Sequence, residues 1–137
     1  MYFDGISEKT IKTNRLNISY LEAGEPTNPA MILLHGNFSS SHFWPTNMRY
    51  LADKFWVIAP DLRGFGNTEA LPIDATRGMR DWSDDLQSLV EALNIKTPFH
   101  LIGWSLGGSV ALQYAIDHPA SLATLVLIAP SSPYGAT

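Results

Sequence analysis

The segment Phe99-His100-Leu101-Ile102-Gly103-Trp104-Ser105-Leu106-Gly107-Gly108 decides the fold of this 137-residue chain. It starts as a mostly apolar run, typical of a buried strand, and an apolar stripe at steps of three and four residues follows, typical of a helix. Between them lies the pattern G-x-S-x-G, which holds a serine at a sharp, strained turn from strand to helix. Gly103, Gly107 and Gly108 lack side chains where strand and helix must pack closely. This context predicts that Ser105 is a nucleophile. The alternative is a glycine-rich turn with an incidental serine.

Three other apolar runs in the chain predict strands buried on both faces, and hence a parallel sheet covered by helices. These runs are residues 30–34, 55–59 and 122–129. Residues 16–22 alternate between apolar and polar, which predicts a strand with one solvent-exposed face. Residues 9–12 would be its antiparallel hairpin partner.

Helical patterns lie between the predicted strands, over residues 44–51, 79–93 and 106–114. This alternation predicts an α/β fold, doubly wound, with a mostly parallel sheet and an N-terminal antiparallel hairpin. In such folds ligands bind outside the carboxyl ends of the strands, so we expect the chemistry there.

Composition excludes several classes of function. Nine lysines and arginines against 13 aspartates and glutamates give a formal charge of −4, which argues against nucleic-acid binding. The chain has no cysteine, so disulfides, zinc–thiolate sites and cysteine nucleophiles are excluded. The four histidines are scattered, so no metal or cofactor is expected. With no signal-peptide pattern and no apolar run of about 20 residues, we expect a cytoplasmic protein without membrane contact.

The loop after residues 30–34 reads His35-Gly36-Asn37-Phe38. Acyl transfer needs two hydrogen-bond donors aimed at the developing oxyanion. We assign them to the backbone N–H groups of Leu106 and Asn37, with Phe38 as the fallback for Asn37. His35 could act as a general base, but its place in this loop favours a structural hydrogen bond.

Other aromatic and charged residues are interpreted as lining a pocket or as structural. Phe38, His42, Trp44 and Trp104 are expected to line an apolar substrate pocket. Asp61 and Arg63 could tie their own turn together. His100 and His118 are interpreted as structural, and the pair Asp84-Asp85 as a solvated patch on the polar side of its helix.

Taken together, the residues resemble the α/β-hydrolase superfamily, in its single-domain esterase and C–C hydrolase branch. The resemblance covers essentially the whole chain and rests on three landmarks in the family order, residues 35–37, 61–66 and 103–108. Dehalogenases and epoxide hydrolases of this superfamily look similar around Asn37 and Asp61, but they use aspartate at the elbow. Because this chain has Ser105 there, that chemistry is disfavoured. The order of serine, acid and histidine in the family also argues against Asp61 as the catalytic acid.

The resemblance further implies that residues 1–137 are the N-terminal part of a single α/β-hydrolase domain, which ends after the sixth strand. Family members continue with a cap, later strands, a catalytic acid and a catalytic histidine. Here no acid follows Asp117 and no histidine follows His118. We therefore expect the C-terminal remainder, as a second chain or within a precursor, to supply the acid and the base. Residues 122–129 would form an open apolar edge, at which the chain could also self-associate.

The implied function is a serine hydrolase that acts on a small carboxylic ester, or a similar acyl or C–C substrate, through an acyl-enzyme. It would be active only when completed. One alternative is a catalytically dead half-domain that serves as a binding or assembly module. Another is lyase or perhydrolase chemistry on the same elbow.

Overall fold

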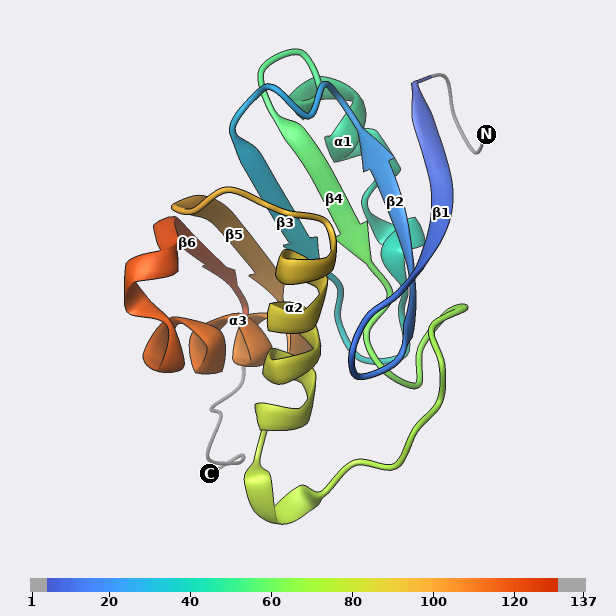
Figure 1. Ribbon diagram of the computed structural model, residues 1–137, viewed down its shortest axis with the longest axis vertical. Helices are drawn as coiled ribbons and strands as arrows, with labels where there is room; N and C mark the ends of the chain where they lie inside the picture. Colours follow the sequence, from blue (N-terminus) through green and yellow to red (C-terminus); the bar gives the residue numbers. More distant parts are fainter. Residues whose placement is uncertain (1–4, 131–137) are drawn as a thin grey trace.

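The computed structural model describes residues 5–130 and consists of one mixed β-sheet with helices on both faces (Figure 1). The α-helices are α1 (Pro45–Leu51), α2 (Arg80–Ala92) and α3 (Leu106–Asp117). The strands are β1 (Ile6–Lys12), β2 (Asn17–Ala23), β3 (Ala30–Leu34), β4 (Trp56–Pro60), β5 (Phe99–Trp104) and β6 (Leu122–Ile128). Short 3₁₀ helices occupy Ser41–Phe43 (η1), Ala75–Arg77 (η2) and Pro119–Ser121 (η3).

The six strands follow the order β1-β2-β4-β3-β5-β6. Strands β1 and β2 form an antiparallel hairpin, β2 pairs antiparallel with β4, and β3, β4, β5 and β6 run parallel. The predicted fold class is therefore confirmed, and β3 has the predicted bounds. The hairpin partner is longer than predicted, because β1 begins at Ile6 rather than residue 9.

Two apolar layers hold the helices on the sheet. The layer under α2 and α3 joins Leu86, Leu89 and Tyr114 to strand residues such as Ile32. The layer under α1 joins Trp44 and Met48 to residues on the opposite face of the same strands. All residues of β3 and β4 are buried, as expected for central strands covered on both faces.

Strand β6 corrects one prediction and confirms another. It lies at the edge of the sheet, as expected, but it is not buried on both faces. Leu125 and Leu127 pack on the layer under α3, whereas Val126 and Ile128 are each 44% exposed. The apolar run alone could not show this difference, because burial depends on which elements cover each face.

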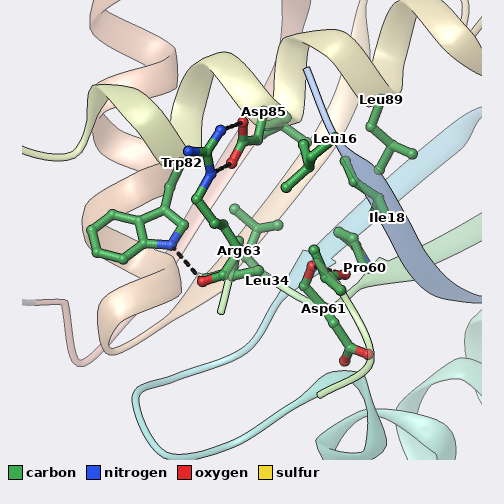
Figure 2. Close-up of a pocket in the computed structure, with 12 residues that line it drawn as sticks. Leu16, Ile18, Leu34, Pro60, Asp61, Arg63, Trp82, Asp85 and Leu89 are labelled. Atoms are coloured by element: carbon green, nitrogen blue, oxygen red, sulfur yellow. Dashed lines mark hydrogen bonds and ion pairs between the residues drawn. The ribbon is translucent and has the colours of Figure 1, made fainter. Parts of the chain in front are cut away.

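A buried ion pair fastens the loop after β4 to helix α2 and overturns two predictions (Figure 2). Asp85 is buried, not solvated, and it accepts two hydrogen bonds of 2.8 Å from the Arg63 guanidinium and one of 2.8 Å from Arg15 Nε. Its neighbour Asp84 is more exposed and pairs with Arg77. Arg63 is thus committed to Asp85, and Asp61 does not tie its turn to Arg63. A cavity of about 10 Å³ beside this pair has room for one water molecule at most.

Candidate active site

Ser105 sits at the corner between β5 and α3, in a backbone conformation that side chains rarely adopt. Its φ and ψ angles are 55° and −118°, and its N–H donates to Ile128 O at the end of β6, at 2.9 Å. For a residue with a side chain this conformation costs on the order of 1–3 kcal/mol, and such strain clusters at functional sites. The corner is therefore the strained strand-to-helix turn that the sequence predicted.

The glycines around Ser105 allow the close approach on which this corner depends. A Cβ atom on Gly103 would lie 2.3 Å from Gly107 O, and one on Gly107 would lie 2.4 Å from the carbonyl oxygens of Leu34 and His35. Gly108 is less constrained, with its nearest atoms at 3.0 and 3.2 Å. Helix α3 thus packs directly on the backbone of β5 and on the end of β3.

The first turn of α3 provides backbone donors beside the serine. Ser105 O accepts the first hydrogen bond of the helix, from Ser109 N at 3.1 Å. Within residues 5–130, no side chain caps this end of the helix. The Leu106 N–H is the first of the helix, so no carbonyl within the helix accepts its hydrogen bond. It lies at the positive end of the helix dipole.

The loop after β3 meets the elbow at Gly36. A Cβ atom built on Gly36 would lie 3.1 Å from Ser105 Cβ and 2.7 Å from the Trp104 ring. The next residue, Asn37, is exposed. Its side-chain oxygen accepts a hydrogen bond of 3.1 Å from Phe38 N. The structure thus brings the predicted oxyanion loop and the predicted nucleophile side by side, with the Phe38 N–H already engaged.

Both ring nitrogens of His35 are engaged, and this fixes its role. Leu62 N donates to Nε2 at 2.9 Å, so Nε2 is unprotonated, and Nδ1 carries the proton that it donates to Gly36 O at 2.8 Å. The imidazole is completely buried, and this burial lowers its pKa. His35 is therefore a neutral link between its own loop and the loop after β4, and neither nitrogen is available as a general base.

The state of His35 predicts a pH dependence of stability. Because its pKa is lowered in the folded chain, the unfolded chain binds the proton more tightly. The free energy of unfolding should therefore fall as the pH drops below about 6.5, by at most about 1.4 kcal/mol per pH unit for one group. Urea unfolding between pH 7.5 and 5 measures this, with His35→Gln as the control that removes the titrating ring. An equal slope in the wild-type chain and in His35→Gln would contradict the assignment.

The predicted pocket residues do not form one group. Phe38 is 96% exposed, with a φ of 58°, at the tip of the loop. His42 is exposed and lies near Glu8 of β1, with 3.6 Å between Nε2 and Oε1. Trp44, in contrast, is buried in the layer under α1, which corrects its assignment to an open pocket. Trp44 and Met48 are four residues apart at the start of α1, so both lie on the side of the helix that packs on the sheet.

The ring of Phe43, a residue that the sequence analysis missed, stacks on Trp104. The two rings are 4.2 Å apart and nearly parallel, at 8°. Phe43 is 47% exposed and belongs to η1, so this stack joins the segment after the predicted oxyanion loop to the residue before Ser105. The aromatic run of residues 42–44 was the available signal, but it did not show which ring points where.

His100 and His118, which were interpreted as structural, both make contacts within the fold. His100 Nδ1 lies 2.7 Å from Thr124 Oγ1, between β5 and β6, and the His118 ring packs on Tyr114 at the end of α3.

In the described part of the chain, residues 5–130, no helix is both long and apolar enough to cross a bilayer.

The chain has many relatives of known sequence and structure. A family model described as alpha/beta hydrolase fold matches residues 29–136. A fluoroacetate dehalogenase of Burkholderia sp is 30% identical, and a 2-hydroxy-6-oxo-6-phenylhexa-2,4-dienoate hydrolase of Comamonas testosteroni is 33% identical. They match 92% and 93% of this chain, which spans only 41% and 44% of their lengths. Among solved structures, a bacterial membrane phospholipase A has a TM-score of 0.85 at 32% identity, with 93% of this chain and 40% of that chain covered.

Proposed function

This chain belongs to the alpha/beta hydrolase fold family, and on that premise we propose that it carries the nucleophile and the oxyanion hole of a serine hydrolase. The observation that carries the proposal is the strained Ser105, at a φ of 55°, with the Gly36 backbone against its Cβ. A strained turn of this kind has a cost in stability, and such strain clusters at functional sites.

The proposed reaction is acyl transfer through a covalent intermediate. Ser105 Oγ attacks the carbonyl carbon of an ester while a base removes its proton, and a C–O bond to the enzyme forms. The N–H groups of Leu106 and Asn37 stabilise the tetrahedral oxyanion. Asn37 is preferred to the fallback Phe38, because the Phe38 N–H already donates to the Asn37 side chain. The alcohol then leaves with a proton, and water hydrolyses the acyl-enzyme and restores the Ser105 hydroxyl.

A small carboxylic ester, or a C–C bond beside a carbonyl, is the substrate class that we propose. Relatives of this chain are named as a monoacylglycerol lipase, a dienoate hydrolase and a fluoroacetate dehalogenase. Relatives thus catalyse several reactions, and the nucleophile at the elbow limits which of them this chain can carry out. A serine forms an acyl-enzyme, whereas displacement of a halide calls for a carboxylate nucleophile, which this elbow lacks.

The acid and the base are proposed to come from polypeptide beyond these residues, either the C-terminal remainder of the hydrolase or a second chain. His35 is excluded as the base because both of its nitrogens are engaged. Asp61 is disfavoured as the acid because it precedes Ser105, whereas the acid of the family follows the serine, and its carboxylate already joins two loops. The open edge of β6 is the proposed site at which the remaining polypeptide, or a second copy, joins the sheet.

The same edge supports the second candidate function, a binding or assembly module without catalysis. Strand β6 has no charged residue or proline, the usual features that prevent an edge strand from pairing with another chain. Ester turnover that is lost in Ser105→Ala would reject this alternative.

Lysine substitutions on β6 should abolish association. Val126→Lys and Ile128→Lys place charges on the exposed side of the strand and leave Leu125 and Leu127 packed under α3. Size-exclusion chromatography with light scattering should then show a loss of self-association or of a bound companion chain. Tyr50→Lys, at an 81% exposed position on α1, is the matched control. A wild-type chain that stays monomeric without a companion, or lysine variants that associate like wild type, would contradict the proposal.

Covalent labelling tests the proposed function. A fluorophosphonate reacts with a serine that is activated by a base and held beside oxyanion donors. Mass added at Ser105, in the chain or in a complex that contains it, would support the proposal. The absence of labelling in every such form would reject it.

A further inference from the structure

We propose that Asp61 is a positioning residue of this site, which holds the oxyanion loop at its far end; the inference rests on the proposed function of Ser105 and deepens it. Asp61 follows β4 directly and is only 3% exposed. One carboxylate oxygen accepts a hydrogen bond of 2.7 Å from Ser41 N, and the other accepts one of 3.0 Å from Asn67 N. The carboxylate thus joins two loops that are far apart in the sequence.

The contact with Ser41 fixes the end of the loop that carries the proposed Asn37 donor. At its start, His35 Nε2 accepts a hydrogen bond from Leu62 N, and at its end Ser41 N donates to Asp61. Both anchors therefore reach the two residues that follow β4. Between them lie residues 36–40, where Asn37 and Phe38 are exposed and Phe38 has a positive φ. The span is thus held at both of its ends by residues that directly follow β4.

A second path of contacts leads from Asp61 to the nucleophile. Ser41 begins η1, whose Phe43 stacks on Trp104, and the Trp104 ring also packs against Gly36. Trp104 directly precedes Ser105. Loss of the hydrogen bond between Asp61 and Ser41 would therefore free η1. The Phe43–Trp104 stack, which packs against Gly36 beside Ser105, would then lose its support.

The surroundings of Asp61 fit its role as a hydrogen-bond acceptor for the two loops. Its neighbour Arg63 is committed to Asp85, and Figure 2 shows the Asp61 carboxylate turned away from that pair. The backbone at Gly66, with a φ of 51°, lies directly against the Asp61 carboxylate. Only glycine fits there, because a Cβ atom would lie 2.3 Å from Asp61 Oδ2. Hydrogen bonds to an ionised acceptor are about twice as strong as neutral ones. A buried carboxylate thus suits a loop that must stay in place while an oxyanion forms beside it.

The test compares Asp61→Ala and Asp61→Asn with Asp81→Ala. Asp81 is a matched control, because it is also buried and accepts a backbone N–H, from Asp74 at 2.7 Å, but it lies on α2. Two quantities are measured for each folded variant, alone and with any polypeptide that completes the site. One is hydrogen exchange of the amides of residues 36–41. The other is fluorophosphonate labelling, separated into the maximal rate and the probe concentration at half-maximal rate.

Asp61→Ala is expected to speed exchange in the loop and to lower the maximal labelling rate on the order of 10–100-fold, with little change in the half-maximal concentration. Asp61→Asn keeps one oxygen acceptor without the charge and should give intermediate values. Asp81→Ala should lower stability and leave both quantities unchanged. Folded Asp61 variants with wild-type exchange and a wild-type maximal rate would overturn the proposal.

The two proposals fail in different ways. If the wild-type chain is never labelled, the proposed function fails, and loop exchange alone decides the role of Asp61. If Asp61→Ala does not fold, Asp61→Asn decides, and an unchanged loop in that variant overturns the inference.

Discussion

Gly107→Ala is expected to destabilise the chain by more than about 3 kcal/mol, a large fraction of the roughly 5–15 kcal/mol that stabilises a typical domain. A Cβ atom at this position would lie 2.4 Å from two backbone oxygens, those of Leu34 and His35. Backbone cannot move aside as a flexible side chain does, so α3 would have to separate from β3. Chemical unfolding, or thermal unfolding followed by circular dichroism, measures the loss.

Gly64→Ala is the matched control for this prediction. Gly64 has a φ of 82°, but nothing lies within 4 Å of a Cβ atom built on it. Its replacement therefore measures the conformational cost alone, roughly 1–2 kcal/mol. If Gly107→Ala were no more destabilising than Gly64→Ala, the close packing of the elbow would be contradicted.

Ser105→Ala is expected to abolish ester turnover and covalent labelling, with a loss of at least about 10³-fold where the site is complete. The variant removes only the hydroxyl, and no side chain caps the helix among residues 5–130, so the fold should keep its stability. Labelling of Ser105→Ala at the wild-type rate would show that another residue reacts.

Ser105→Gly separates backbone strain from chemistry at the same position. Glycine adopts a positive φ without the cost that a side chain meets, although it gains more freedom in the unfolded chain. Ser105→Gly should therefore be inactive and about 1 kcal/mol more stable than Ser105→Ala. Equal stability of the two variants would argue that Ser105 is not strained.

The elbow and the central strands could be predicted from the sequence because they depend on local patterns. The run of residues 30–34 and the spacing of Gly103, Ser105 and Gly107 each specify their structure within a few residues. The choice of Asn37 as an oxyanion donor followed from the His35-Gly36 signature of its loop, and it stays a prediction.

The errors concern side chains whose partners are distant in the sequence. Asp85 looked solvated because its partners, Arg63 and Arg15, lie 22 and 70 residues away. Asp61 looked like a partner of Arg63 because the two are close in sequence, yet it reaches Ser41, 20 residues away. Periodicity shows which face of a helix is apolar, but it does not show which charges the fold brings to the other face.

Intact-mass analysis after treatment with a fluorophosphonate, followed by peptide mapping, shows whether Ser105 is the nucleophile. One added probe mass is expected on the peptide that contains Ser105, in the chain or in a complex with its completing polypeptide, and none in Ser105→Ala. Probe mass on a different residue, or no added mass in any form of the folded protein, would contradict the assignment of Ser105 as the nucleophile.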